Sequence, residues 1–233
     1  MPSALRLAVF DVDGTLVDSQ HNIIAAMAAA FVMHGLPEPE AGVVRRVIGL
    51  SLVEAVAAVA PELDTELHWR LAHSYKEAFA SLRSRPDHEE PLYPGALETL
   101  GRLAEAGWLL GIATGKSQRG VRSMLDRHGL HGRFLSIQTA DEHPGKPHPS
   151  MLLTAMAESG VGVAETVMIG DTAYDMLMAK KAGVTGIGVA WGYHHPDELR
   201  QAGADAVVEA YDALLALLLG TKVGTRECVS SPL

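Results

Sequence analysis

The sequence predicts an α/β protein with a Rossmann-like parallel sheet core and an inserted helical cap domain. Short apolar runs have the near-continuous hydrophobicity of strands buried on both faces of a parallel sheet. They are residues 6–10, 109–113, 166–170 and 186–190. Helix-like stretches alternate with these runs, at residues 95–106, 118–128, 150–159 and 175–182. Strand, loop and helix in alternation are typical of βα units, which place helices on both faces of a parallel sheet.

One long segment interrupts this alternation and predicts a second domain. Between about residues 19 and 90 the chain has Ala-rich stretches, IIAAMAAAFVMHG and SLVEAVAAVAPEL, and little strand-like sequence. A simple crossover between parallel strands usually needs only one helix, so this segment is too long to be one. We therefore expect a core made of residues 1–17 and 88–222, a helical cap at 18–87 and a loose tail at 223–233.

The composition limits the class of protein and its partners. The 233 residues, 48% of them apolar and 20% charged, suit an ordinary globular chain with a sizeable core. A formal net charge of -9 argues against broad binding to nucleic acid or anionic membrane, and a small anion remains a possible ligand. The single cysteine, Cys228, requires no oxidising compartment, and no apolar run is long enough to span a membrane. Without a signal or transit peptide at its start, the chain is expected to be cytoplasmic, as a monomer or a homodimer.

Polar residues with a common chemistry follow the predicted strands. They are Asp11 and Asp13 after the first run, Thr114 and Gly115 after the second, Asp171 and Asp175 after the third, and Lys146 in a connecting loop. The carboxyl ends of parallel strands meet at one edge of a sheet, where active sites of such folds lie. Clustered carboxylates need a cation, and Mg²⁺ prefers carboxylate, carbonyl and water oxygens shared with a substrate phosphate. Thr114, Lys146 and backbone N–H groups would hold the other phosphate oxygens.

Four motifs in this order resemble those of the haloacid dehalogenase (HAD) superfamily. They are FDVDGTLVDS, ATGKS, GKPHPS and MIGDTAYDM, and the resemblance spans about residues 6 to 219. It implies a Rossmann-like core and a helical cap inserted just after the first motif. By the same resemblance, Asp11 is the nucleophile that forms an aspartyl phosphate, and Asp13 is the general acid and base. Thr114 and Lys146 resemble the pair that holds the phosphate.

The resemblance also implies a metal site. Asp171 would bind Mg²⁺ directly, together with Asp11 and the backbone carbonyl of Asp13. Asp175, the second acid of the last motif, is expected to act from outside the ion's own ligands. In the cap, Arg45 and Arg46 are candidates to contact an anionic group of the substrate when the cap closes.

The first motif narrows the reaction. Members of the superfamily that are dehalogenases lack an acid at the place of Asp13, and P-type ATPases carry a threonine there, so Asp13 points to a phosphatase or a phosphomutase. The stretches PGALETL, ATGKS, GKPHPSM and GDTAYDMLMAKKAG look most like phosphoglycolate phosphatases and their relatives. We therefore expect a Mg²⁺-dependent phosphatase acting on a small phosphorylated metabolite, with 2-phosphoglycolate as the leading candidate.

Several alternatives remain open. A pyrophosphatase, a sugar-phosphate phosphatase or a β-phosphoglucomutase-like phosphomutase would share the core residues. A signalling receiver domain also places acids, a Thr and a Lys around a phosphorylated Asp with Mg²⁺. Such a domain is about half this length and carries its phosphorylated Asp after a later strand, which argues against it. A catalytically silent binding protein is disfavoured because no core motif residue is missing.

Overall fold

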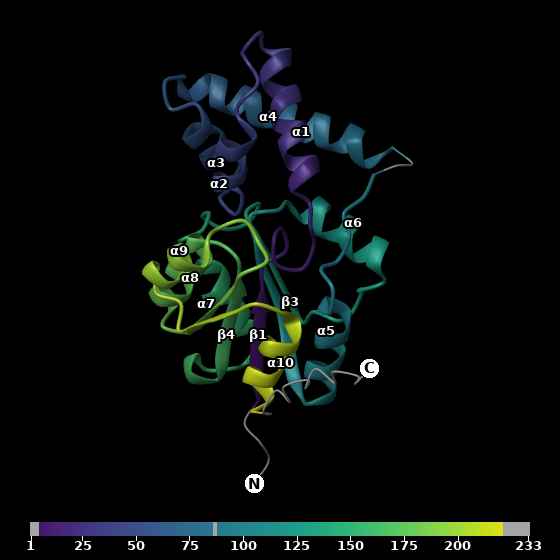
Figure 1. The fold of residues 1–233 in the computed structure, drawn as a ribbon, viewed down its shortest axis with the longest axis vertical. Helices are drawn as coiled ribbons and strands as arrows, with labels where there is room; N and C mark the ends of the chain where they lie inside the picture. The colour runs from purple at the N-terminus through teal and green to yellow at the C-terminus, as the bar shows by residue number, and fades with distance from the viewer. Residues whose placement is uncertain (1–4, 86–87, 221–233) are drawn as a thin grey trace, which may run out of the picture.

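The computed structural model describes residues 5–85 and 88–220. The predicted loose tail at 223–233, with Cys228, lies outside these described residues. The described chain forms a helix-flanked sheet below and a group of helices above it (Figure 1).

The sheet has six parallel strands in the order β3-β2-β1-β4-β5-β6. Their bounds are β1 Arg6–Phe10, β2 Trp108–Thr114, β3 Ser136–Thr139, β4 Thr166–Gly170, β5 Thr185–Val189 and β6 Ala206–Val208. The predicted runs at 6–10 and 166–170 match their strands. The run at 109–113 is one residue shorter than β2 at each end, and the run at 186–190 is shifted by one residue from β5. The short outer strands β3 and β6 were not predicted, because neither forms an apolar run of the length seen in the inner strands.

Helices cover both faces of this sheet (Figure 1). Those of the core are α5 Ala96–Glu105, α6 Gln118–His128, α7 Ser150–Ser159, α8 Ala173–Ala182, α9 Pro196–Gln201 and α10 Tyr211–Leu219, with a 3₁₀ turn at Val163–Glu165. The helices predicted at 118–128 and 150–159 have the expected bounds. The one predicted at 175–182 begins earlier, at Ala173, because the side chain of Thr172 caps it by accepting from the backbone N–H of Asp175.

Side chains of β1 alternate between two hydrophobic clusters, which explains why this strand is apolar throughout. Ala8 and Phe10 pack with buried residues of α5, α6 and α10. Leu7 and Val9 pack with those of α7 and α8 on the opposite face. Successive side chains of a strand point to opposite faces, so a strand covered on both faces carries apolar residues at every position. The predicted α/β class with a parallel sheet is confirmed.

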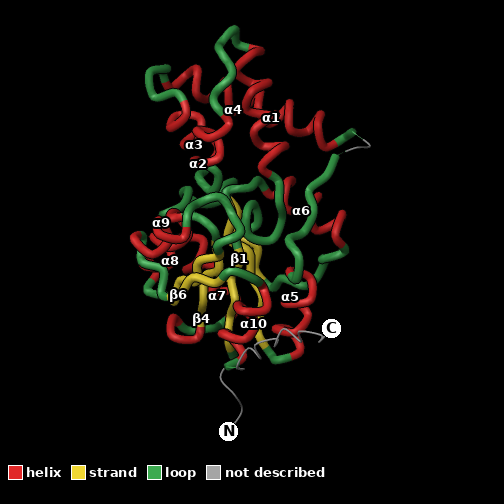
Figure 2. Tube along the Cα trace, in the orientation of Figure 1, coloured by secondary structure: helices red, strands yellow, loops and turns green. Residues whose placement is uncertain are grey.

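Four helices lie beyond the carboxyl ends of the strands (Figure 2). They are α1 Gln20–Met33, α2 Ala41–Val47, α3 Leu52–Val59 and α4 Thr65–Arg83. They share a separate hydrophobic cluster that includes Met27, Val56, Leu71 and Phe79. We call these helices and their connections the cap, and we keep as a proposal the division into a core of 1–17 and 88–222 and a cap of 18–87.

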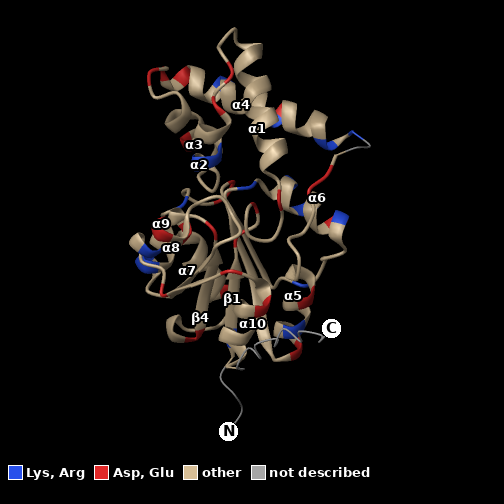
Figure 3. Cartoon of the chain, in the orientation of Figure 1, with Lys and Arg blue, Asp and Glu red and all other residues tan. Residues whose placement is uncertain are grey.

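Charged residues of both signs lie on the cap and on the core (Figure 3). Within residues 5–85 and 88–220, none of the helices combines the length and apolarity needed to cross a bilayer.

Candidate active site

Asp11 and Asp171 are delivered to one point by neighbouring strands. Each follows its strand directly, Asp11 after β1 and Asp171 after β4. The two strands pair in parallel with Phe10 opposite Ile169, and the backbone N–H of Asp11 donates to the carbonyl of Ile169 at 2.9 Å. Both side chains are buried, with at most 1% of each residue exposed. The edge of the sheet therefore brings these two carboxylates together, as the strand-end argument predicted.

The turn after β1 is shaped to fit around Asp171. Gly14 adopts φ +87°, and a Cβ atom at this position would lie 2.2 Å from Asp171 Oδ2, so both the backbone conformation and the space require glycine. The hydroxyl of Thr15 donates to Asp171 Oδ1 at 2.8 Å. The backbone N–H of Tyr193 donates to Oδ2 at 2.9 Å. Asp171 is thus held through both of its oxygens.

Lys146 and Asp175 complete the buried group. Lys146 reaches in from the loop between β3 and α7, and its Nζ lies 2.8 Å from Asp11 Oδ1 and 2.7 Å from Asp175 Oδ1. Asp175 Oδ2 accepts hydrogen bonds from the backbone N–H and the hydroxyl of Thr172, at 3.0 and 2.7 Å, in a capping box at the start of α8. Burial alone would lower the pKa of Lys146, but the charges of Asp11 and Asp175 raise it, so the lysine stays cationic.

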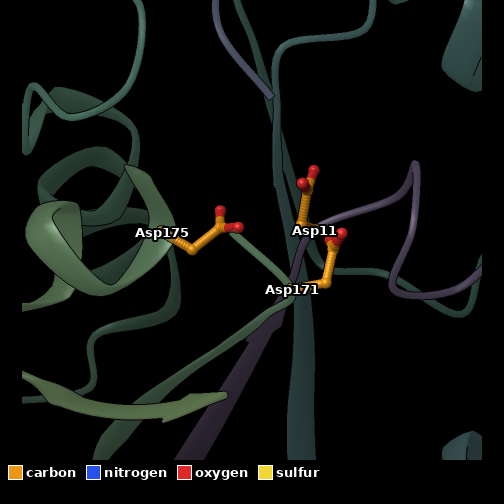
Figure 4. Close-up of side chains that lie close together, drawn as sticks. All are labelled: Asp11, Asp171 and Asp175. Atoms are coloured by element: carbon orange, nitrogen blue, oxygen red, sulfur yellow. The ribbon is translucent and has the colours of Figure 1, made fainter. Parts of the chain in front are cut away.

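The carboxylates of Asp11, Asp171 and Asp175 converge (Figure 4). An oxygen of each lies within 4.8 Å of one from the others. Burial, together with the charges of Asp175 and Asp13, raises the pKa of Asp11 to about 7, although the charge of Lys146 opposes the rise. Burial, with the charges of Asp11 and Asp175, also raises the pKa of Asp171 well above its ordinary value. Lys146 alone does not offset these carboxylates, and Asp11 Oδ2 is buried with no hydrogen-bond partner among the described residues. The donor set fits a hard divalent cation.

Asp13 belongs to a different set of contacts, beside the triad. Its Oδ1 accepts from the hydroxyl of Ser19 at 2.6 Å and from Lys116 Nζ at 2.7 Å. The same Nζ donates to Glu90 Oε1 at 3.1 Å. The side chain of Asp13 is therefore not one of the three converging carboxylates, which leaves only its backbone carbonyl for the predicted metal contact.

The sequence argument assigned no role to Lys116, Ser19 or Glu90. The first two lie inside the quoted motifs ATGKS and FDVDGTLVDS, so the motifs carried a signal for them. Glu90 follows the cap and had no such signal. Burial alone would lower the pKa of Lys116, but Asp13 and Glu90 raise it. Burial also opposes the ionisation of Glu90, yet Lys116 holds its pKa below the ordinary value.

Thr114 and Gly115 lie where β2 ends, facing the cap. The Thr114 side chain is buried, and its hydroxyl accepts from the backbone N–H of Lys116 at 3.2 Å. A Cβ atom on Gly115 would lie 2.6 Å from the carbonyl oxygen of Leu50 and 2.9 Å from that of Gly49. The connection between α2 and α3 of the cap therefore lies directly on the end of β2, and Gly115 permits this close approach.

Arg45 and Arg46 have partners away from the buried acids. Arg45 Nε donates to Gln20 Oε1 at 2.9 Å, within the cap. Arg46 pairs with Glu198 of α9 at 3.1 Å, and its side chain is 69% exposed. Neither is among the residues that line the cavity described next. Their predicted contact with a substrate stays a prediction.

A cavity of about 930 Å³ lies between the cap and the core and reaches Asp13. Its cap wall is largely apolar and includes Ile23, Leu52, Tyr75 and Phe79. Its core wall is mostly polar and includes Lys116, Ser117, Arg119 and Asp141. This volume falls within the range of pockets that hold drug-sized molecules.

Comparison with known proteins agrees with this fold and gives the family of the chain. The family described as haloacid dehalogenase-like hydrolase matches residues 8–189. "Probable phosphatase IndB" of Dickeya dadantii (strain 3937) is 35% identical over 212 residues, 90% of this chain and 91% of its own. "Phosphoglycolate phosphatase" of Vibrio cholerae is 30% identical over 224 residues, 93% of this chain and 98% of its own. "N-acetylmuramic acid 6-phosphate phosphatase" of Pseudomonas aeruginosa is 32% identical over 222 residues, 92% of this chain and 95% of its own.

A solved structure gives the same result at the level of the fold. The crystal structure of a hydrolase from Pseudomonas syringae superposes with a TM-score of 0.82 at 30% identity and covers 92% of this chain and 98% of that one. The fold is a parallel α/β sheet flanked by helices, with an aspartate-based site at the carboxyl ends of its strands. The chain belongs to the haloacid dehalogenase-like hydrolase family. Within that family it is a phosphatase-type member, so the predicted class of phosphoric monoester hydrolase is confirmed.

Proposed function

We propose that this chain is a Mg²⁺-dependent phosphatase that hydrolyses a small phosphomonoester through an aspartyl phosphate on Asp11. The observation that carries the proposal is the buried cluster of Asp11, Asp171 and Asp175, with Lys146 between Asp11 and Asp175 and with Asp13 lining the adjacent cavity. Such a cluster combines a nucleophile, ligands for a cation and a proton carrier within one small volume.

In the proposed first step, an Asp11 oxygen forms a bond to phosphorus while the ester P–O bond breaks. The leaving oxygen takes the electron pair of that bond and the proton of Asp13. In the second step, Asp13 takes a proton from water, the water oxygen bonds to phosphorus, and the Asp11 carboxylate leaves with inorganic phosphate released. Lys146 and Thr114 are proposed to hold phosphate oxygens, and the charge of Lys146 reduces the repulsion between carboxylate and phosphate dianion.

Asp11, Asp171 and the backbone carbonyl of Asp13 would hold the Mg²⁺ ion, and Asp175 would support the site through Lys146. When bound, the ion supplies positive charge that offsets the phosphate and the carboxylates. The small size and hardness of Mg²⁺ suit an all-oxygen donor set.

2-Phosphoglycolate remains the leading candidate substrate, since the relative from Vibrio cholerae is a phosphoglycolate phosphatase by name. The cavity favours a second candidate, a larger phosphomonoester such as a sugar phosphate. A two-carbon acid would fill a small part of about 930 Å³, and the cap wall offers apolar contact that glycolate does not use. The relative from Pseudomonas aeruginosa is, by name, a phosphatase of a sugar phosphate.

We propose further that the enzyme is cytoplasmic and acts as a monomer or a homodimer.

The test is phosphate release by the purified protein, with Mg²⁺ and with EDTA, from 2-phosphoglycolate, pyrophosphate, sugar phosphates and nucleoside monophosphates. We expect release that needs Mg²⁺, and its loss in Asp11→Asn with full activity in Asp212→Asn, which changes an exposed acid of α10. Activity that survives in Asp11→Asn would contradict the mechanism. Conversion of a sugar phosphate to its isomer with little free phosphate would instead identify a phosphomutase.

A further inference from the structure

Lys116 is a buried lysine for which the mechanism above has no use. Its side chain is only 7% exposed, and its Nζ lies between two carboxylates, 2.7 Å from Asp13 Oδ1 and 3.1 Å from Glu90 Oε1. A buried ion pair of this kind is costly to desolvate, so its contribution to stability alone does not explain why it lies beside the active site. The question is what it does for Asp13.

The contacts of Asp13 restrict the rotation of its carboxyl group. Oδ1 accepts from Lys116 Nζ and from the hydroxyl of Ser19, which approach from different parts of the chain. Within the part of the chain that the structure describes, Oδ2 makes no hydrogen bond, and Asp13 lines the cavity where the leaving group would lie. One oxygen is thus fixed, and the other is available to carry a proton to the leaving oxygen.

Lys116 is itself held from several sides. Glu90 is 2% exposed, and its Oε2 lies 3.2 Å from His88 Nε2, so this second anchor is also fixed. Phe79 of α4 contributes its ring, with Nζ 5.3 Å from the centroid. Lys146, by contrast, contacts Asp11 and Asp175, so the two lysines serve different sides of the site.

We propose that Lys116 is a positioning residue that holds the Asp13 carboxyl in place for proton transfer to the leaving oxygen, with Glu90 as its second anchor. The inference rests on the proposed phosphatase function. Proton donation matters most when the leaving group is a poor one, because an alkoxide needs the proton whereas a 4-nitrophenolate does not. Removing Lys116 therefore has an effect that depends on the leaving group, which a general loss of structure does not produce.

The test compares kcat/KM, which reports the step that breaks the ester bond, for benzyl phosphate and 4-nitrophenyl phosphate. In Lys116→Met we expect the value for benzyl phosphate to fall by about 10- to 100-fold, and at least about fivefold more than the value for 4-nitrophenyl phosphate. Lys181→Met, which removes an exposed lysine of α8, is the control and should leave both values unchanged. Glu90→Gln keeps Lys116 but weakens its contact with residue 90. Its kcat/KM should again fall more for benzyl phosphate than for 4-nitrophenyl phosphate, with smaller losses than in Lys116→Met. It also replaces Lys116→Met if that variant does not fold.

Three outcomes would overturn the inference, and they are distinguishable. Equal losses on both substrates would show that Lys116 does not act through proton transfer. A larger loss on 4-carboxybenzyl phosphate than on benzyl phosphate would show that Lys116 binds an anionic leaving group. Absence of phosphate release by the unmodified protein, or its persistence in Asp11→Asn, would overturn the phosphatase function itself and this inference with it.

Discussion

Substitution of Gly115 by alanine tests whether the cap must lie against the end of β2 for activity. A Cβ atom at this position would lie 2.6 Å from the carbonyl oxygen of Leu50 and 2.9 Å from that of Gly49. Both contacts are to backbone, so they cannot be relieved by rotating a side chain. To restore ordinary contact the α2–α3 connection must move by about 0.8 Å. Overpacking of this size costs about 1–3 kcal/mol of stability, and a misplacement near 1 Å lowers activity by up to about 100-fold.

The assay for Gly115→Ala combines urea unfolding with steady-state kinetics. We expect kcat/KM for phosphate esters to fall by about 10- to 100-fold. Inhibition by inorganic phosphate should change little, because alanine keeps the backbone N–H at this position. Gly42→Ala is the matched control: it lies in α2 of the cap, a Cβ atom there meets nothing within 4 Å, and we expect unchanged kinetics. A Gly115→Ala protein with unchanged stability and kinetics would refute the reasoning that the cap is seated on Gly115.

Two further predictions concern the buried charges. In metal-free protein the pKa of Asp11 is raised to about 7, so between about pH 4 and pH 7 the folded state holds a proton that the unfolded chain has released. The stabilisation that this proton gives the folded state therefore falls as the pH rises from about 4 to about 7. Mg²⁺ needs the deprotonated carboxylate, so the rise in Tm that it causes over EDTA-treated protein should be larger at pH 8 than at pH 5; an equal rise at both would contradict this. Lys146→Met leaves Asp11 and Asp175, at 2.8 and 2.7 Å, without their buried cation. This substitution should lower the free energy of unfolding in urea by about 3–5 kcal/mol without Mg²⁺, and by less with Mg²⁺. The control Lys181→Met, at an exposed residue, should change the free energy of unfolding little. An equally small effect of both substitutions would refute the role of Lys146 as the buried cation of this pair.

Parts of the fold were predictable because strands covered on both faces must be apolar at every position. The run at residues 6–10 and its partner at 166–170 obey this rule and match β1 and β4. β3 does not obey it, because Ser136, Gln138 and Thr139 are polar and yet buried. Gln138 contacts Ser136 and Glu158 through its amide, so hydrogen bonds made only in the folded chain replace the apolar signal.

The candidate site also has a part that could be predicted from the sequence and a part that could not. Asp11 and Asp171 could be brought together from sequence because each directly follows a strand, and neighbouring parallel strands end at one edge. The environment of Lys116 could not be predicted from the sequence, because a lysine after a strand is ordinarily exposed. Its partner Glu90 follows the last helix of the cap, far from Lys116 in the order of the fold's elements. The ion pair between Lys116 and Glu90 forms only when the cap and the core pack together, so no local sequence pattern predicts it.

The division of contacts between Asp11 and Asp13 links the chemistry to the cap. Asp11 is held by the sheet and by Lys146, all parts of the core. Asp13 is held by Ser19, immediately before the first cap helix, and through Lys116 by Glu90, after the last one. These anchors lie at the two places where the chain passes between core and cap. A movement of the cap about these crossings would disturb Asp13, the proposed proton carrier, and leave Asp11, the proposed nucleophile, in place. On that proposal, closure over a substrate and readiness for proton transfer would occur together.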